Sequence, residues 1–266
     1  MKIGFIGVGN MAKSIIAGWL AKKVFKPEDI LVHSAHQNNY EKYAHETGVT
    51  ACVSNAALVQ EADVILLAVK PFILASVIDE IRNVTTEKKV VVSMASGVSL
   101  SEIATQFKDK RIPIIRIMPN VNVEINEGMT AFVRNAVVTD VSYVQTKSLF
   151  DSLGRTLEIP EKDFSIFVAL AGSSPAYVYY FIDAMARSGV KYGLTKKQAT
   201  EISAQAVLGS AQKVLTATKS PMDMVDDVCS PGGTTIAGLL AMEEAGFMTA
   251  VVKGIDATVL KDQATH

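Results

Sequence analysis

A glycine-rich turn near the N-terminus has the clearest chemical potential in the sequence. Gly7-Val8-Gly9-Asn10-Met11-Ala12 is a G-x-G-x-x-A pattern that follows an apolar run and opens a helical one. Gly7 permits a tight turn, Gly9 lets a pyrophosphate approach the backbone, and Ala12 lets the helix pack close to the strand. The helix N-terminus then offers free N–H groups and its positive dipole end to the phosphates. The pattern indicates a dinucleotide site, and its alternative is a plain strand–turn–helix.

The residues at the end of the second apolar run, Ile30–His33, would determine whether the site prefers NAD(H) or NADP(H). NAD sites usually place Asp or Glu there to bind the ribose hydroxyls, and this stretch has neither. Ser34, His36, Gln37 and Asn38 can donate to a 2′-phosphate, and no carboxylate in the stretch repels it. The sequence therefore predicts NADP(H), with NAD(H) left open because no arginine is present. His33 and His36 form an H-x-x-H pair without further ligands, so no metal site is predicted.

Two further segments each lie at the carboxyl end of a predicted buried strand. They are Ala68-Val69-Lys70-Pro71 and Ala95-Ser96-Gly97. Ligands of an open α/β sheet bind at the carboxyl ends of its strands, so both segments are candidates to line the dinucleotide. The alternative for Lys70 is a solvated lysine in an ordinary strand-to-helix turn.

A second glycine cluster, Ser230-Pro231-Gly232-Gly233-Thr234-Thr235, precedes an apolar helical run. Its two glycines can turn backbone N–H groups inward, two threonine hydroxyls stand beside them, and the helix adds its dipole. Such a nest suits an anion, in particular a carboxylate. The alternative is a helix start with a threonine N-cap and a glycine turn. A further helix start is predicted at Ser174 and Pro175, as N-cap and first residue.

The elements that must position these segments alternate in the first part of the chain. Short apolar runs alternate with helical stretches, which predicts a Rossmann-like doubly wound parallel sheet. The predicted strands are Ile3–Val8, Ile30–His33, Val64–Val69, Val90–Ser93 and Ile112–Met118. The predicted helices are Met11–Lys22, Phe72–Ile81 and Ser99–Phe107.

Strand signals disappear after about Glu161, and long helices are predicted over Pro175–Tyr192, Lys196–Ala217 and roughly Thr235–Lys261. The first of these is apolar on more than one face, so it should be buried all round. These long helices have few other elements within the chain to pack against, so we expect a second subunit to cover them. The sequence therefore predicts a homo-oligomer, at least a dimer.

The bulk composition fits a globular protein of 266 residues, with 49% hydrophobic and 20% charged residues. The formal net charge of −1 gives no basic excess for nucleic acid or a membrane surface. No targeting segment is visible, and no apolar stretch approaches a membrane span. Cys52 and Cys229 lie far apart, which favours two reduced thiols in a cytoplasmic protein.

Together with Arg116-Ile117-Met118-Pro119-Asn120 and Gly172-Ser173-Ser174-Pro175-Ala176-Tyr177, these motifs resemble the pyrroline-5-carboxylate reductase family over nearly the whole chain. The segment 230–239 is the family's signature. The resemblance implies NADPH-dependent reduction of Δ1-pyrroline-5-carboxylate to L-proline, the last step of proline biosynthesis. It also implies a cofactor domain over 1–160 and a helical dimerisation and substrate-binding domain over 161–266.

The resemblance and the strand-end analysis together assign the site residues. Those expected at the cofactor are Ile6, Gly7, Val8, Gly9, Asn10, Met11, Ser34, Asn55, Ala68, Val69, Lys70, Pro71, Ala95, Ser96 and Gly97, with Asn55 near the adenosine ribose. Those expected at the substrate are Ser230, Gly233, Thr234 and Thr235. In the family, backbone amides at Gly233 to Thr235 hold the substrate carboxylate. The hydroxyl of Thr235 reaches the ring nitrogen, which makes it the predicted catalytic residue.

The second glycine cluster agrees with this reaction, because no histidine, lysine or acid stands within it to act as a strong general acid. A protonated imine is already electrophilic, whereas a ketone needs a stronger proton donor. The nearby pair Asp226-Asp227 is expected to be solvated. Orientation and electrostatics would then be the main work of the protein.

The sequence departs from the family at three places. Val121-Asn122 stands where Thr-Pro is usual, near the expected nicotinamide; Asn126 stands where glycine is usual; and Ser173-Ser174-Pro175 replaces Ser-Gly-Pro. Two alternatives therefore stay open. One is a related Rossmann imine or hydroxyacid reductase, although none of Lys191, Lys196, Lys197 and Lys213 sits in a recognisable catalytic motif. The other is a non-catalytic paralogue that binds NADP.

Overall fold

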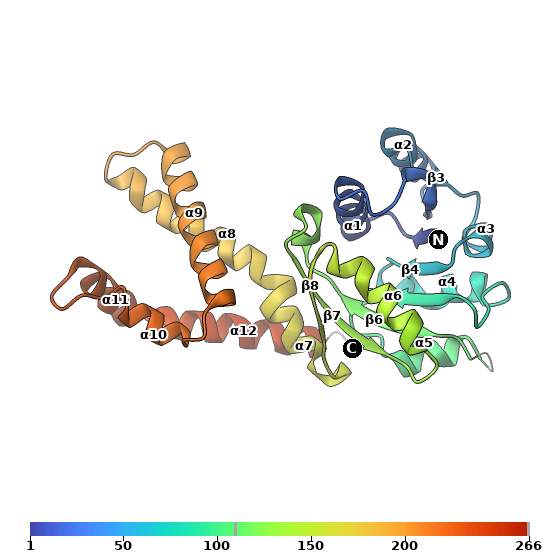
Figure 1. Cartoon of the computed structure of the whole chain (residues 1–266). Helices are drawn as coiled ribbons and strands as arrows, with labels where there is room; N and C mark the ends of the chain where they lie inside the picture. Colours follow the sequence, from blue (N-terminus) through green and yellow to red (C-terminus); the bar gives the residue numbers. More distant parts are fainter. Residues whose placement is uncertain (109–110, 265–266) are drawn as a thin grey trace. The chain divides into compact units, whose positions relative to one another are not determined.

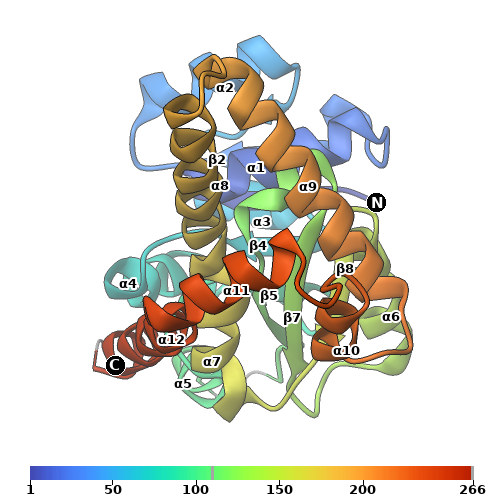
Figure 2. The ribbon, with the colours of Figure 1, turned by 90° about the vertical axis from the view of Figure 1, so that its left-hand side faces the viewer.

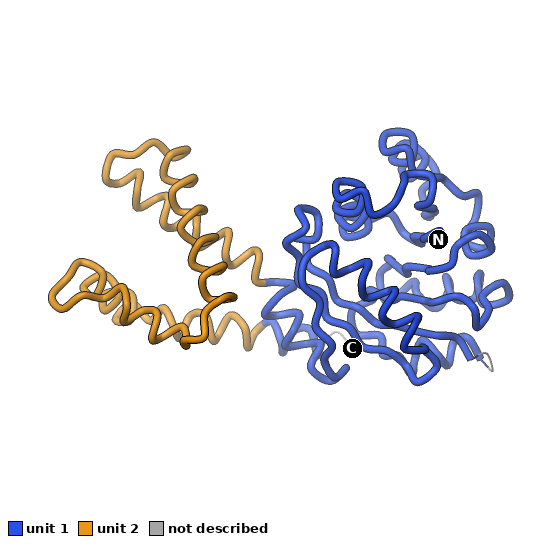
Figure 3. The backbone as a smooth tube through the Cα atoms, viewed as in Figure 1, with its two compact units in different colours: residues 1–173, 258–266 blue, residues 174–257 orange. Residues whose placement is uncertain are grey.

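The computed structural model describes residues 1–108 and 111–264 (Figure 1). The chain forms two compact units (Figure 3). Residues 1–173 together with 258–266 form the first unit, and residues 174–257 form the second. The domain boundary after residue 160 stays a prediction; the first compact unit continues beyond it and includes the end of the last helix.

The first unit is built on one eight-stranded sheet with the order β3-β2-β1-β4-β5-β6-β7-β8. The strands are β1 (Ile3–Ile6), β2 (Ile30–His33), β3 (Thr50–Ala51), β4 (Val64–Leu67), β5 (Val90–Ser93), β6 (Ile114–Met118), β7 (Gly128–Arg134) and β8 (Gly154–Glu158). The pairs among β1 to β6 are parallel, β7 is antiparallel to β6, and β8 is parallel to β7. The order 3-2-1-4-5-6 is that of the Rossmann fold, so the predicted fold class is confirmed.

The predicted strands are confirmed, although some of the observed strands are shorter than predicted. Val8 and Val69 lie outside β1 and β4, because the chain turns at these points to enter the next helix. The sequence missed β3, β7 and β8. The two residues of β3 are both exposed, and β8 is buried at none of its five positions, so neither carries the apolar pattern of a core strand.

Helices cover both faces of the sheet. They are α1 (Asn10–Ala21), α2 (Gln37–Thr47), α3 (Asn55–Glu61), α4 (Pro71–Ile81), α5 (Leu100–Gln106) and α6 (Asp140–Asp151), with short 3-10 turns η1 (Pro27–Asp29), η2 (Val121–Ile125) and η3 (Glu161–Asp163). Side chains of α1, α2 and α6 pack in one apolar cluster, and those of α3, α4 and α5 pack in a second. Successive strand residues alternate between the clusters: Phe5 belongs to the first and Ile6 to the second.

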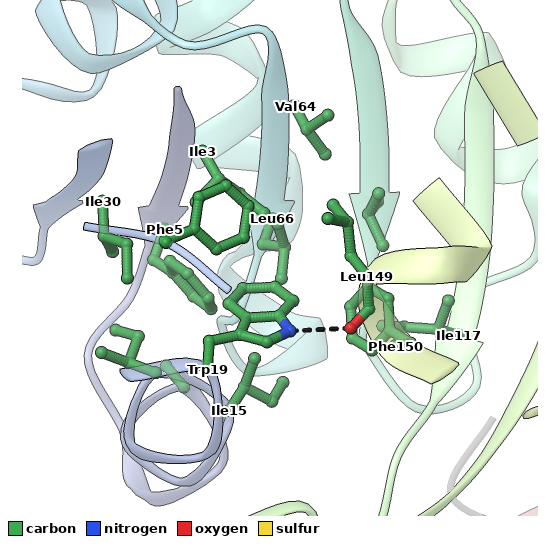
Figure 4. Close-up of a cluster of buried hydrophobic side chains, with 14 of the residues drawn as sticks. Ile3, Phe5, Ile15, Trp19, Ile30, Val64, Leu66, Ile117, Leu149 and Phe150 are labelled. Atoms are coloured by element: carbon green, nitrogen blue, oxygen red, sulfur yellow. Dashed lines mark hydrogen bonds between the residues drawn. The ribbon is translucent and has the colours of Figure 1, made fainter. Parts of the chain in front are cut away.

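Trp19 fixes α1 to the sheet (Figure 4). Its indole is fully buried and meets Phe5, Phe25 and Phe150 edge-on, with ring centroids 5.8, 5.2 and 5.4 Å away. The indole Nε1 donates to the Leu149 carbonyl at 2.8 Å. Because a buried indole N–H needs an acceptor, this bond sets the orientation of the ring as well as its depth. The start of α1, which carries the first glycine motif, is held in place by this cluster.

The second unit is helical, with α8 (Ser174–Lys191), α9 (Lys196–Thr216), α10 (Pro221–Asp226), α11 (Thr234–Glu244) and most of α12 (Phe247–Gln263). Helices α8 and α9 pack side by side (Figure 2). A Cβ on Gly189 would lie 2.8 Å from that of Ala199, so this crossing requires the glycine. The single helix predicted over Thr235–Lys261 is wrong. The chain breaks between α11 and α12 at Gly246, which has a φ of 78°.

The prediction that Ser174 caps a helix is also wrong. Helix α7 (Phe164–Phe167) continues through a π-helical turn, η4 (Val168–Ser173), directly into α8. The continuous helix Glu161–Lys191 has 31 residues and is long and apolar enough to cross a membrane by length and composition. The expectation that no stretch approaches a membrane span is therefore wrong. A helix that a protein partner covers passes the same test, so the length alone does not indicate a membrane.

Asn120 supports the π-helical turn from the sheet. Pro175 has no N–H to return to the carbonyl four residues earlier, that of Ala171. The Asn120 side chain is 5% exposed, and its Nδ2 donates to the Ala171 carbonyl at 3.0 Å. Its Oδ1 accepts from the Met129 backbone N–H at 3.1 Å. One buried amide thus joins the end of β6, the start of β7 and the turn before α8.

We expect Asn120→Ala to lower the free energy of unfolding by about 2–4 kcal/mol, because two buried backbone groups lose their partner. Asn120→Asp should also destabilise, since a carboxylate accepts from Met129 but cannot donate to the Ala171 carbonyl. The measurement is chemical denaturation at fixed protein concentration. Asn39→Ala, at an exposed position on α2, is the control and should stay within about 0.5 kcal/mol. Equal stabilities for the Asn120 and Asn39 variants would contradict this role.

Candidate functional site

The first glycine motif lies where β1 meets α1, between the ends of β2 and β4. The Gly7 N–H donates to the His33 carbonyl at 2.8 Å, and the Ala68 N–H donates to the Ile6 carbonyl at 2.8 Å. Gly7 has a φ of 101°, and a Cβ on it would lie 2.4 Å from the Ala68 carbonyl oxygen. The turn therefore requires glycine both for its backbone conformation and for the close approach of the neighbouring strand end.

The surroundings of Gly9 are open, whereas those of Gly7 are crowded. It is the N-cap of α1 and is exposed, and a Cβ on it would meet nothing within 4 Å. No described side chain caps the first N–H groups of α1. Free amides beside open space at the positive end of a helix fit a pyrophosphate group. The residues present at this turn thus suit the phosphates of a dinucleotide.

The way helices begin separates two classes of helix in this chain. Five α-helices, α3, α5, α6, α9 and α10, start with a serine or threonine whose hydroxyl accepts from the backbone. In contrast, α1, α2, α4, α7 and α11 have Gly9, His36, Lys70, Asp163 and Gly233 as N-caps, and none of these side chains caps the helix. All of these starts except that of α7 belong to segments to which the sequence assigns ligands. Amides that a serine would otherwise satisfy are left for a bound anion.

The expected 2′-phosphate region surrounds the uncapped start of α2. Ser34 is half-buried, and His36, Gln37 and Asn38 are exposed. The Gln37 Nε2 donates to Glu41 at 2.8 Å, so this amide is turned toward a carboxylate one turn along the helix. Ser34, His36 and Asn38, together with the helix N-terminus, are left as the donors of this region.

Asn55 lies at the start of α3 and faces α4. Its side chain is 8% exposed, and its Nδ2 donates to Glu80 Oε2 at 2.7 Å. Its Oδ1 is buried and has no hydrogen-bond partner in the described part of the chain. The structure thus gives Asn55 a carboxylate partner that the sequence did not predict, and its place near the adenosine ribose stays a prediction.

The other two strand ends also lie on the carboxyl side of the sheet. Lys70 is exposed and precedes Pro71, the first residue of α4. After β5, Ala95 is buried and Gly97 turns the chain with a φ of 71°. Ser96 between them donates its hydroxyl to Asp262 Oδ1 at 3.1 Å. The segments after β1, β4 and β5 belong to adjacent strands, so their ends share one edge of the sheet as predicted.

The second glycine cluster lies in the second unit. Gly232 has a φ of 67°, Gly233 is the N-cap of α11, and its N–H donates to the Ser230 carbonyl at 3.0 Å. A Cβ on Gly233 would lie 2.4 Å from Ser230 Oγ. Thr234 and Thr235 are the first two residues of the helix, and both are exposed. The alternative in which a threonine caps this helix is therefore wrong, because glycine occupies the cap.

The acidic pair beside this cluster is not a proton source. Asp226 is exposed, as predicted. Asp227 pairs with Lys219, whose Nζ lies 2.8 Å from Oδ2. Hydrogen bonds from this ammonium hold the pKa of the Asp227 carboxyl below its usual range, so the group is ionised at neutral pH. Both acids are exposed, so the expectation that they are solvated is confirmed, and Asp227 has in addition a lysine partner that the sequence did not predict.

The helices of the second unit leave large apolar side chains exposed. On α8 only Pro175 and Ala186 are buried. Its exposed apolar residues include Tyr177, Val178, Tyr179, Tyr180, Met185 and Val190. A groove of about 670 Å³ between α8 and α9 is lined by Phe181, Met185, Ala206, Val207, Ser210, Ala211, Val214 and Leu215. Apolar surface on this scale calls for a protein partner.

Comparisons with known proteins decide the family. Residues 161–265 match the model of pyrroline-5-carboxylate reductase dimerisation, and residues 2–97 match that of NADP oxidoreductase, coenzyme F420-dependent. A pyrroline-5-carboxylate reductase of Escherichia coli is 39% identical over 262 residues, covering 98% of this chain and 97% of the relative. The chain belongs to the pyrroline-5-carboxylate reductase family.

Solved structures of the pyrroline-5-carboxylate reductase family agree. The Streptococcus pyogenes enzyme has a TM-score of 0.88 at 40% identity, covering 99% of this chain and 98% of that one. The Plasmodium falciparum enzyme with NADP bound has a TM-score of 0.89 at 29% identity, covering 99% and 97%. The resemblance, the cofactor class and self-association through the helical region are thereby confirmed.

Val121-Asn122, where the resemblance leads us to expect Thr-Pro, begin η2. The turn packs on α1 so closely that a Cβ on Gly18 would lie 2.3 Å from the Val123 carbonyl oxygen. The Asn122 carbonyl accepts from the Glu127 N–H at 3.1 Å. The turn is thus held by its own backbone and by α1, so proline is not needed to keep its shape.

Sequence reasoning missed the residues that support the site from a distance. Glu80, Glu161 and Asp262 each hydrogen-bond to a residue of a recognised motif or beside one, from elsewhere in the sequence. No local pattern marks them, because their partners lie 25 to 166 positions away.

Substitution of the two glycines of the first motif should affect different properties, cofactor binding for Gly9 and stability for Gly7. Gly9→Ala should keep stability within about 0.5 kcal/mol, since its φ of −82° suits alanine and its Cβ meets nothing. The same methyl group would fill the space expected for the pyrophosphate and should raise the Kd for NADPH about tenfold or more. Gly7→Ala should instead cost about 1–3 kcal/mol of stability. Denaturation and NADPH titration on both variants check this, and normal NADPH binding by Gly9→Ala would be the contrary result.

Proposed function

We propose that the chain reduces Δ1-pyrroline-5-carboxylate to L-proline with NADPH. One observation carries the proposal. In a chain that matches pyrroline-5-carboxylate reductases along its length, the two glycine-led helix starts, at Gly9 and Gly233, both lack side-chain caps. One start suits the phosphates of a dinucleotide and the other suits a substrate carboxylate. A reductase of a small, carboxylate-bearing imine needs these two anion sites.

The proposed roles of the substrate residues follow from their position on α11. The backbone N–H groups of Thr234 and Thr235 bind the carboxylate. The Gly233 N–H, also expected there, donates instead to the Ser230 carbonyl and so shapes the turn beneath them. The Thr235 hydroxyl donates to or accepts from the ring nitrogen and so orients the C=N bond. Bound NADPH supplies the hydride. The protein supplies orientation and a fixed electrostatic environment, since the protonated imine needs no further strong acid.

The proposed cofactor residues are those of the three adjacent strand ends and of the α2 start. The amides at Gly9, Asn10 and Met11 hold the pyrophosphate, and Ile6, Gly7 and Val8 form the turn that presents them. Ser34 and the uncapped start of α2 bind the 2′-phosphate. The segments Ala68–Pro71 and Ala95–Gly97 line the rest of the dinucleotide, and Asn55 lies beside its adenosine ribose.

We place the enzyme in the cytoplasm as a homo-oligomer of at least two chains. The free thiols of Cys52 and Cys229 suit a reducing compartment. The exposed apolar faces of α8 and α9 and the dimerisation match support association of helical units. A second copy of the chain that covers the long apolar helix also accounts for its apolar composition, so no membrane partner is proposed. The net charge of −1 gives no basic excess with which to bind nucleic acid, so no nucleic-acid partner is proposed either.

The assay that tests the proposal follows NADPH oxidation with pyrroline-5-carboxylate. We expect turnover, with a higher kcat/KM for NADPH than for NADH, because no acid stands at the end of β2. A panel of hydroxy acids with NADP+ should give no turnover, which separates this enzyme from a hydroxyacid dehydrogenase. NADPH binding without imine turnover would instead support a non-catalytic paralogue.

Ser34→Asp should reverse the cofactor preference. A carboxylate at the end of β2 repels the 2′-phosphate of NADPH and can accept from the ribose hydroxyls of NADH. We expect kcat/KM to fall at least tenfold with NADPH and to change little with NADH. Ser34→Asn, which adds no charge, is the matched control and should keep the preference for NADPH. If the aspartate variant still prefers NADPH, the 2′-phosphate is bound elsewhere.

Thr235→Ala should lower kcat/KM for the imine about 10- to 100-fold, because one hydrogen bond to the reacting group contributes about 1.5–3 kcal/mol. Thr235→Ser keeps the hydroxyl and should retain most activity. Thr235 is the second residue of α11 and caps nothing, so the melting temperature and the Kd for NADPH should stay near those of the parent enzyme. An alanine variant with normal kcat/KM removes Thr235 from the mechanism.

A further inference from the structure

The loop after β5 is held from both sides by carboxylates from the C-terminal part of the chain. In its middle, the Ser96 hydroxyl donates to Asp262 Oδ1 at 3.1 Å. At its far end, the backbone N–H of Leu100, the first residue of α5, donates to Glu161 Oε1 at 2.8 Å. Both carboxylates lie within the region 161–265 that matches the dimerisation family, one near each end of it.

The two carboxylates have different surroundings. Glu161 pairs with Arg116 at 2.8 Å, and the Arg116 side chain is only 7% exposed. The Arg116 guanidinium also lies 4.6 Å from the centre of the Phe164 ring. This end of the loop is therefore anchored in the core, as part of the structure of the first unit. Asp262 is half-buried in the last turn of α12, and it contacts a side chain of the loop itself.

The bond to Asp262 determines what Ser96 can offer. A serine hydroxyl has one proton and two lone pairs, and it rotates to suit its partners. With the proton committed to a carboxylate, the rotamer is fixed and the hydroxyl offers only its lone pairs to other groups. Gly97 follows in the left-handed region, with a φ of 71°, and Ala95 precedes, so neither direct neighbour of Ser96 has a branched side chain that would restrict it. Asp262 supplies the restriction from outside.

We propose that Asp262 is a positioning residue for the cofactor. Through Ser96 it holds the loop after β5 in one conformation, so less freedom is lost when the dinucleotide binds. The inference rests on the proposed function, which assigns Ala95 to Gly97 to the cofactor site. It goes beyond the glycine motifs, because Asp262 stands 166 positions from Ser96 and close to the C-terminus.

A double-mutant cycle on the full-length protein tests the proposal. The Kd for NADPH is measured by fluorescence titration without substrate for the parent, Ser96→Ala, Asp262→Ala and the double variant. Each single variant should raise the Kd about five- to tenfold, as expected for a partly exposed hydrogen bond to a charged group. The double variant should bind no more weakly than the weaker single variant, because both changes remove the same bond. In turnover, KM for NADPH should rise while kcat stays within about twofold.

Further variants separate positioning from a general effect on the fold. Asp262→Asn keeps an acceptor and should bind NADPH within about threefold of the parent. Asp256→Ala removes an exposed carboxylate from the same helix and should leave the Kd unchanged. Asp262→Gln, which moves the acceptor by one methylene, serves as a second disruptive variant should Asp262→Ala be poorly folded. Light scattering should give the same assembly for all of them.

The outcomes distinguish this inference from the proposed function. If Ser96→Ala and Asp262→Ala both leave the Kd unchanged, the hydrogen bond between them does not contribute to cofactor binding, and the positioning role of Asp262 is overturned while the proposed function stands. If Ser96→Ala weakens binding but Asp262→Ala does not, or if the two effects add, the site stands and the positioning role of Asp262 is overturned. Coupled effects with rescue by Asp262→Asn establish it.

Discussion

A helix start that binds a ligand cannot also be satisfied by its own side chains, and this constraint organises the molecule. The first N–H groups of a helix need an acceptor, and serine or threonine usually supplies it. Here α3, α5, α6, α9 and α10 have such caps, whereas α1, α2, α4 and α11 do not. These last four starts are less stable by themselves, and they depend on the rest of the fold to keep their backbone in place.

The surrounding structure meets this need by packing. Trp19 pins α1 between the sheet and α6, and the close approach of Gly7 to the Ala68 carbonyl fixes the turn before the helix. Asn120 performs a similar task at the end of β6, where it joins two strands to a π-helical turn. In each case a buried side chain with its polar atoms satisfied holds a backbone segment in place.

The sequence predicted well those features that depend on local pattern. Continuous apolar runs such as Val64–Leu67 marked the central strands, and the spacing of Gly7 and Gly9 marked the turn. It failed where tertiary context decides. Pro175 looked like a helix start, yet the helix passes through it because a π-helical turn and the Asn120 amide accommodate the missing N–H. Gly246 divides a helix that apolar spacing alone would continue. The candidate site was predicted where motifs are contiguous, and its supporting carboxylates were not, because Glu161 and Asp262 reach their partners only through the fold.

The return of α12 to the first unit has a consequence for how the protein is made. Residues 258–266 belong to the same compact unit as the sheet, whereas residues 174–257 form the helical unit between them (Figure 3). A chain emerging from the ribosome can complete the sheet and its helices early, since domains fold as they are synthesised. Asp262, however, can reach Ser96 only after the whole helical unit between them has been synthesised. The loop after β5 therefore reaches its final form later than the strands and helices that precede the helical unit.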